Sequence, residues 1–190
     1  MPNREDSQQL KQRLFALLKE RAYREGNIVL SSGKIGSYYI DARVVTLSAE
    51  GAYLTAALIL DLVKDKDISA IGGPTLGADP FLGAIGVLSF LGKNPINTFI
   101  VRKTPKEHGT QKRIEGPALK KGDKVIIVDD VATSWGSLLD CISILRQEGV
   151  IVEGAVAIID REEGAIENLA RVSCPLTSIF KASEFKSSKI

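Results

Sequence analysis

Several residue types and patterns are scarce in this chain of 190 residues, and each scarcity excludes a class of protein. The single histidine, His108, excludes a histidine-rich metal centre. Cys141 and Cys174 are the only cysteines and form no Cys-x-x-Cys pair, so we expect a reduced, cytoplasmic protein whose thiols pack in the interior. No apolar run reaches the ~18 residues that a membrane span needs, and the first residues hold no apolar signal core. We therefore expect no membrane partner.

Charge and glycine patterns exclude further classes. The net charge of +2 creates no strong field toward nucleic acid, so we expect no nucleic-acid partner. Gly72 and Gly77 have the spacing of a P-loop, but Ala78 and Asp79 stand where a nucleotide triphosphatase needs Lys and Ser or Thr. Because no Gly-x-Gly-x-x-Gly opens a helix, a dinucleotide enzyme is not supported either.

The chain does contain a regular alternation of apolar strands and helices, in a length that suits one domain, 1–190. We expect strands at 68–72, 96–101, 124–130, 153–160 and 176–180, and helices at 76–92, 135–148 and 163–170. Continuous apolar strands are typical of a parallel sheet covered on both faces. The sequence therefore predicts an α/β fold with a Rossmann-like parallel sheet flanked by helices.

A smaller N-terminal unit, residues 1–46, precedes this core of residues 47–190. It begins with an amphipathic helix that Gly26 is expected to end, followed by short strands within residues 27–46. Ser48 is the expected N-cap of the next helix. One N-terminal helix is too little for a helix-turn-helix, which argues against a DNA-binding module.

One segment interrupts the alternation. Between the strands at 96–101 and 124–130 the pattern predicts a helix, but residues 102–116 read RKTPKEHGTQKRIEG. Pro105 and Gly109 oppose a helix, apolar residues are almost absent, and basic residues outnumber acidic ones. Long loops of this kind in a compact domain are usually functional or disordered. We interpret residues 102–116 as a mobile, functional loop.

The stretch 125-VIIVDDVATSWGS-137 carries the residues best suited to chemistry. Asp129 and Asp130 come at the end of a buried strand, where open parallel sheets bind their ligands. The small hydroxyl residues after them lead into a helix, whose N-terminus binds phosphate through backbone N–H groups. Carboxylates beside an anion cradle suit a sugar phosphate, and the turn after residue 72 offers further N–H groups for a second anion. A solvated turn with an N-cap explains the same composition, so both interpretations stay open here.

Four segments, in the right order, resemble motifs of the type I phosphoribosyltransferases. Residues 125–137 resemble their phosphoribosyl-pyrophosphate signature, and 102–109 resemble the Arg-Lys-x-x-Lys-x-His-Gly loop of the orotate phosphoribosyltransferase family. Residues 30–43 resemble the hood segment that borders the orotate ring, and 158–164 resemble the stretch whose arginine meets the orotate carboxylate. The resemblance implies the type I phosphoribosyltransferase fold with a small N-terminal hood, and the transfer of phosphoribose to orotate in pyrimidine (UMP) biosynthesis.

The resemblance also implies a role for each matching residue. As catalytic residues it implies Lys106, His108, Asp129 and Asp130. The same four, with Arg102, Lys103, Val131, Ala132, Thr133, Ser134, Trp135, Gly136 and Ser137, would bind phosphoribosyl pyrophosphate. Orotate would contact Thr133, Arg161 and Tyr39. Mg²⁺ is the implied cofactor, held mainly by ligand and water near Asp129 and Asp130, which we call the acidic pair. The resemblance also implies a homodimer in which the subunits share loop 102–116.

Three positions depart from the family pattern. Ser31 stands where well-known members carry Lys, and no Lys occurs near Gly77, where some members have one. Trp135 stands where the phosphate loop usually has Gly, and we expect its side chain to point outward while its N–H serves the phosphate. Two alternatives therefore remain: a phosphoribosyltransferase for another base, and a non-catalytic regulator that binds phosphoribosyl pyrophosphate. The basic loop and Arg161 favour the orotate enzyme.

Overall fold

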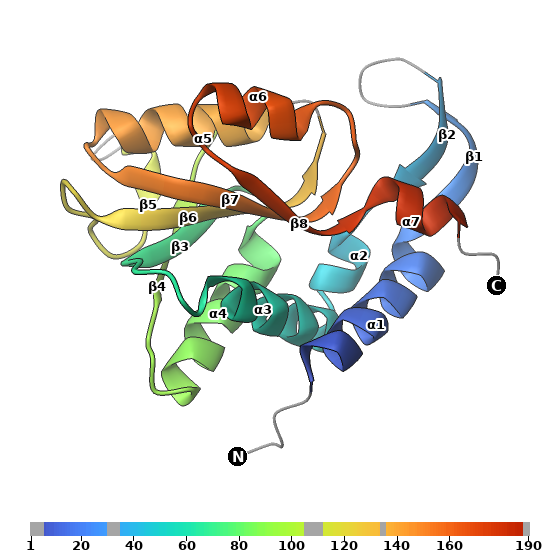
Figure 1. Ribbon diagram of the computed structural model, residues 1–190, viewed down its shortest axis with the longest axis horizontal. Coiled ribbons are helices and arrows are strands. Elements are labelled where there is room, and N and C mark those ends of the chain that lie inside the picture. The colour runs from blue at the N-terminus through green and yellow to red at the C-terminus, as the bar shows by residue number, and fades with distance from the viewer. Residues whose placement is uncertain (1–5, 30–34, 105–111, 134–135, 188–190) are drawn as a thin grey trace.

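The computed structural model describes residues 6–29, 35–104, 112–133 and 136–187, and within them a central sheet lies between two layers of helices (Figure 1). The order of the six strands is β5-β4-β3-β6-β7-β8. Their bounds are Ile114–Glu115 (β5), Asn97–Val101 (β4), Ala70–Pro74 (β3), Lys124–Ala132 (β6), Ile151–Asp160 (β7) and Leu176–Lys181 (β8). All neighbours pair in parallel except β5, which runs antiparallel to β4. The predicted parallel sheet is confirmed, with this short antiparallel edge as an addition.

Helices cover both faces of the sheet, as predicted. One face carries α3 (Ala49–Val63) and α4 (Asp79–Leu91), and the other carries α5 (Gly136–Gln147) and α6 (Ala165–Arg171) (Figure 1). Alternate residues of β6 serve the two layers, because successive side chains of a strand point to opposite faces. Ile126 and Val128 pack with side chains of α3 and α4, whereas Val125 and Ile127 pack with those of α5. The sheet is therefore buried on both sides, and only its edges and ends are open to ligands.

The N-terminal unit consists of a helix and an antiparallel hairpin. Helix α1 (Ser7–Leu17) continues as a π-helical turn, η1 (Leu18–Ala22), and is followed by β1 (Tyr23–Val29), β2 (Ile35–Ile40) and the short helix α2 (Arg43–Thr46). We call β1 and β2 the hood hairpin. The prediction that Gly26 ends the helix is wrong, because the helix has already ended at Ala22. Gly26 lies within β1 at φ 142°, where the pairing with β2 shifts register. Glycine at this position therefore allows a β-bulge.

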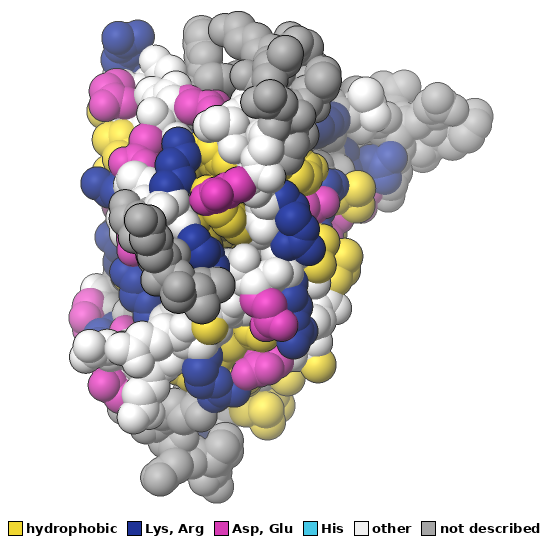
Figure 2. Space-filling model, turned by 90° about the vertical axis from the view of Figure 1, so that its right-hand side faces the viewer, with side chains coloured by type: hydrophobic (Ala, Val, Ile, Leu, Met, Phe, Trp, Pro, Cys, Tyr) yellow, Lys and Arg dark blue, Asp and Glu magenta, His cyan; other side chains and the backbone are white. Residues whose placement is uncertain are grey.

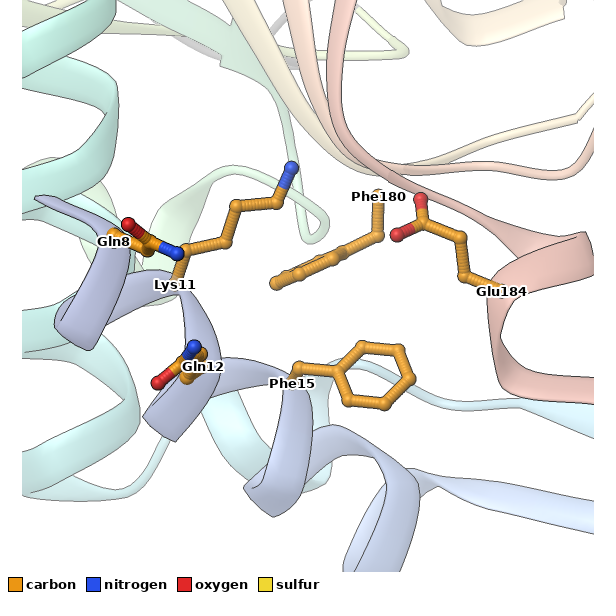
Figure 3. Close-up of a pocket in the computed structure, with 6 residues that line it drawn as sticks. All are labelled: Gln8, Lys11, Gln12, Phe15, Phe180 and Glu184. Atoms are coloured by element: carbon orange, nitrogen blue, oxygen red, sulfur yellow. The ribbon is translucent and has the colours of Figure 1, made fainter. Parts of the chain in front are cut away.

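A C-terminal helix, α7 (Ala182–Ser187), packs against the N-terminal helix (Figure 1). The fully buried Phe185 joins them, with its ring centroid 4.7 Å from that of Phe15. Beside this contact lies a groove in which the Lys11 side chain extends over the ring of Phe180, 5.3 Å from its centroid (Figure 3). This helix was not predicted, because two apolar residues in six, Ala182 and Phe185, are too few to show a helical periodicity.

The remaining sequence predictions concern thiols and the surface. Cys141 and Cys174 are both buried as free thiols, as expected. Of the helices in the described residues, none combines the length and hydropathy that a bilayer span requires. On the face shown in Figure 2, basic and acidic side chains are interspersed, with hydrophobic side chains between them. The charges on that face are therefore mixed in sign, unlike the one-signed stripe that is typical of nucleic-acid binding.

Ser48 caps α3 as predicted, and this contact can be tested. Its Oγ accepts a hydrogen bond of 3.1 Å from the backbone N–H of Gly51. We expect Ser48→Ala to lower the free energy of unfolding by about 1 kcal/mol, measured by urea denaturation. Ser143→Ala, an exposed change within α5, is the matched control and should have little effect. Equal stabilities for the two variants would contradict the capping role.

Candidate active site

The acidic pair lies at the carboxyl edge of the sheet, where ligands bind in open α/β folds. Asp129 and Asp130 belong to β6, which continues to Ala132 because β7 pairs with it as far as Asp160. Strand β6 is thus longer than the predicted 124–130, and the two acids are held by the sheet itself. Asp129 is only 5% exposed, whereas Asp130 is half-buried.

Hydrogen bonds fix both carboxylates. The Asp129 Oδ2 accepts a bond of 3.0 Å from the Ser137 hydroxyl, and its Oδ1 accepts one of 3.0 Å from the Asp130 N–H. The Asp130 Oδ1 accepts a bond of 2.7 Å from the N–H of Val131. Ser137, whose predicted phosphate contact remains a prediction, ties the first turn of α5 to the acidic pair. Thr133 is exposed, and Gly136 begins the helix.

The surroundings of the two acids disfavour their charged forms. Burial, followed by the charge of Asp130, raises the pKa of Asp129 to about 7. Burial also raises the pKa of Asp130, and the charge of Arg43 opposes that rise. No cluster of three or more His, Cys, Asp or Glu among the described residues makes a protein-only metal site. One buried and one half-buried carboxylate side by side fit a hard divalent cation that brings its other ligands with it, as Mg²⁺ does.

The turn after β3 packs its backbone against the acidic pair. A Cβ on Gly77 would lie 2.0 Å from Asp129 Oδ1 and 2.8 Å from Asp130 Oδ1, so a side chain has no room there. Glycine at this position thus has a physical reason in this chain. Because residues 75–78 form the turn, the predicted helix 76–92 begins only at Asp79, whose Oδ2 accepts a 2.6 Å bond from the Thr75 hydroxyl.

Arg161 lies at the end of β7, next to the segment that follows the acidic pair. Its backbone N–H donates a bond of 2.9 Å to the carbonyl of Ala132, which places the residue beside β6. Its side chain is 12% exposed and pairs with Glu163 across 3.0 Å. However, the Nε of Arg161 is buried with no hydrogen-bond partner in the described part of the chain. An unmet buried donor beside a ligand-binding edge indicates a missing acceptor, such as a carboxylate.

The hood hairpin brings one tyrosine to Arg161 and turns the other outward. The ring of the buried Tyr38 lies 5.2 Å from the Arg161 guanidinium carbon, whereas Tyr39 is 38% exposed. Alternation along β2 accounts for this difference. The predicted contact of Tyr39 with orotate remains a prediction, and Tyr38 is the residue that touches the arginine.

Arg43, in α2, is a charged residue near the site that the sequence analysis did not identify. Its Nε and Nη2 pair with Asp41 at 2.9 Å and 3.1 Å. The hydrogen bond and the charge of Asp41 raise the pKa of Arg43 most. Burial lowers this pKa, and the charges of Asp130 and Tyr39 raise it further. The signal available in the sequence was a cation inside the hood motif YYIDAR, close to the tyrosines. Arg43 therefore links the hood electrostatically to the acidic pair.

Hydrogen bonds join the two ends of loop 102–116 to each other. The Arg102 N–H donates a bond of 2.8 Å to the Arg113 carbonyl, and the Arg113 Nη2 donates one of 2.6 Å to the Lys103 carbonyl. The Arg102 guanidinium lies 3.5 Å from Glu115, within β5. The prediction of a loop over all of 102–116 is therefore wrong at its C-terminal end, because Ile114 and Glu115 form β5, which pairs with β4. The predicted site residues Lys106, His108, Ser134 and Trp135, and the position Ser31, lie outside the described residues.

Comparison with known proteins identifies the family. No protein-family model matches the chain. The orotate phosphoribosyltransferase of Aquifex aeolicus is 42% identical over 177 residues, which are 92% of this chain and 96% of the relative. That of Thermosynechococcus vestitus is 42% identical over 177 residues, 93% of each chain.

Solved structures agree in fold. The orotate phosphoribosyltransferase of Mycobacterium tuberculosis in complex with Fe(III) dicitrate superposes with a TM-score of 0.81 at 33% identity, over 93% of this chain and 98% of that one. The same enzyme in complex with 5-phospho-alpha-D-ribosyl 1-diphosphate gives a TM-score of 0.78 at 29% identity, over 93% and 99%. Since relatives well above 30% identity match nearly their whole length, the predicted family is confirmed, and the chain belongs to the orotate phosphoribosyltransferase family.

Proposed function

We propose that this chain transfers the phosphoribosyl group of 5-phosphoribosyl 1-pyrophosphate to orotate. The products are orotidine 5′-monophosphate and pyrophosphate, a step of UMP biosynthesis. The observation that carries the proposal is the unpartnered Nε of Arg161, buried beside the sheet edge that holds Asp129 and Asp130. A base with a carboxylate supplies the acceptor that this donor lacks, and a sugar beside the acidic pair supplies hydroxyl donors.

The acidic pair suits the sugar. The ribose hydroxyls donate hydrogen bonds to carboxylate oxygens of Asp129 and Asp130, which the backbone N–H groups of Asp130 and Val131 hold in place. As the bond from the ribose carbon to pyrophosphate breaks and the bond to the orotate nitrogen forms, the ribose becomes oxocarbenium-like. Two fixed carboxylates close to that carbon favour the positive charge that develops there. The N–H groups of residues 131–137, which lead into α5, are proposed to hold the 5′-phosphate.

The basic loop suits the leaving group. Arg102 and Lys103 stand at its described base, and Lys106 and His108 are proposed to contact the pyrophosphate and assist proton movement. When bound near the acidic pair, Mg²⁺ would neutralise charge that develops on the leaving pyrophosphate. A loop that closes over the site also excludes water, which would otherwise hydrolyse the activated sugar.

We further infer a homodimer that shares loop 102–116 between subunits, in the cytoplasm. The family resemblance supports the dimer, and the end of α4 offers an apolar surface for it, since Phe90 and Leu91 are 70% and 63% exposed. The buried free thiols Cys141 and Cys174 support a reducing compartment. Light scattering on the purified protein tests the oligomeric state.

A panel of bases tests the activity. The protein is incubated with phosphoribosyl pyrophosphate, Mg²⁺ and one of orotate, uracil, hypoxanthine, adenine or xanthine, and the products are identified by mass spectrometry. We expect orotidine 5′-monophosphate from orotate alone. A nucleotide of another base would support the alternative phosphoribosyltransferase. No product with any base, despite binding of phosphoribosyl pyrophosphate, would support the regulator.

Arg161→Gln is expected to act on orotate selectively. Loss of the charged donors should raise the KM for orotate about 30-fold, equivalent to roughly 2 kcal/mol, with the KM for phosphoribosyl pyrophosphate nearly unchanged. Steady-state kinetics with each substrate varied in turn measures both constants. Arg171→Gln, at an exposed arginine of α6, is the control. An equal rise in both KM values would show that Arg161 does not bind the orotate carboxylate selectively.

A further inference from the structure

Helix α7 is attached to the loop that carries Arg161. Glu162, the next residue, has φ 60°, and its Oε2 accepts a bond of 2.9 Å from the N–H of Ser183 at the start of α7. Its own N–H donates a bond of 2.9 Å to the buried carboxylate of Asp160. The backbone on both sides of Arg161 is thereby fixed, on one side by β7 and on the other by α7.

A second contact joins α7 to Arg161 through the hood hairpin. The Nζ of Lys186, in α7, lies 4.3 Å from the centroid of the Tyr38 ring. The Arg161 guanidinium carbon lies 5.2 Å from the same centroid. Tyr38 is 7% exposed, so both cations contact a buried ring, although Lys186 itself is exposed. The Tyr38 ring thus connects Arg161 to the C-terminal helix.

Helix α7 is itself held rigidly enough to serve as a support. The Phe185 ring is fully buried, 4.7 Å from the centroid of Phe15 and 5.9 Å from that of Tyr23. The Lys19 ammonium donates a hydrogen bond to the Phe185 carbonyl. Glu184 lines the groove toward α1 (Figure 3), and Lys186, two residues further on, projects to another side of this short helix. Packing on α1 therefore determines where Lys186 meets Tyr38.

We propose that α7 positions Arg161 for the carboxylate of the base, with Lys186 as a positioning residue that acts through the Tyr38 ring. This inference rests on the proposed function, because it assigns Arg161 a carboxylate ligand. Without the Lys186 contact, Tyr38 is less firmly placed, and the guanidinium that lies on it is free to turn further toward Glu163, its partner at 3.0 Å. The cost falls on ligands with a carboxylate and leaves other ligands unaffected.

The test compares two nucleotides that differ in that carboxylate. Isothermal titration calorimetry measures the binding of orotidine 5′-monophosphate and of UMP to the wild type and to Lys186→Met, which keeps the aliphatic chain and removes the charge. We expect orotidine 5′-monophosphate to bind about fivefold more weakly to the variant and UMP to bind equally well. Lys66→Met, at an exposed lysine after α3, is the matched control and should change neither affinity.

A double-mutant cycle separates positioning from a direct charge effect. If Lys186 acts through the ring, Lys186→Met adds no further loss once Tyr38→Leu has removed the ring. Additive losses, or a Lys186→Met variant that keeps the full preference for orotidine 5′-monophosphate over UMP, would overturn the inference and leave the proposed function intact. A wild type without any such preference would overturn the proposed function and the inference with it.

Discussion

Gly77→Ala is expected to lower kcat/KM for phosphoribosyl pyrophosphate about 100-fold. The added methyl group would lie 2.0 Å from Asp129 Oδ1 and 2.8 Å from Asp130 Oδ1, so either the turn after β3 or the acidic pair must move. Displacements of about 1 Å in groups that position a substrate can cost roughly 100-fold in rate. Steady-state kinetics with phosphoribosyl pyrophosphate varied at saturating orotate measures the loss.

Gly83→Ala is the matched control for this variant. Gly83 lies in α4, its added Cβ would have no atom within 4 Å, and Ala is favoured over Gly in a helix by about 1 kcal/mol. We expect unchanged kinetics and a slightly higher free energy of unfolding. Circular dichroism and thermal melting show whether Gly77→Ala is folded. A folded Gly77→Ala variant with wild-type kinetics would show that the turn yields without moving the carboxylates, and that the acidic pair is not held as we describe.

The central strands were predictable because each is a continuous apolar run that is buried on both faces. The end of β6 was not, since its last two residues are strand only because β7 extends beside them and pairs Ala132 with Asp160. Elements held by distant contacts escaped prediction altogether. Strand β5 has two residues, Ile114 and Glu115, and exists through its pairing with β4, while α7 exists through the burial of Phe185 against α1.

The candidate site divides in the same way. The position of the acidic pair was predictable, because it comes near the carboxyl end of an apolar strand, which faces the ligand edge. Arg161 was singled out only through the family resemblance. Arg43 was not, because its charge reaches Asp130 only when the hood folds over the core. Alternation along β2 turns only one of Tyr38 and Tyr39 inward, but which one depends on how the hairpin packs on Arg161.

Asp129→Asn is expected to stabilise the ligand-free protein at pH 8 and to remove most of its activity. Burial and the neighbouring Asp130 raise the pKa of Asp129 from 3.8 to about 7. Because the folded pKa lies above the unfolded one, the folded state binds more protons between about pH 4 and pH 7. The free energy of unfolding of the wild type therefore falls as the pH rises through this window, and the loss is complete above pH 7. Asparagine has no charge to bury, so the variant should be more stable at pH 8 by about 2–4 kcal/mol.

The same change removes a carboxylate that faces the developing positive charge, so we expect kcat to fall about 100-fold to 1,000-fold. Urea denaturation at pH 5 and pH 8 measures the stability, and steady-state kinetics measures the rate. Asp140→Asn, an exposed change in α5, is the control and should alter neither. An Asp129→Asn variant that is less stable than the wild type at pH 8 would contradict the strain that we assign to the acidic pair. The opposite result would show that this edge of the sheet gives up stability to keep two carboxylates where the sugar binds.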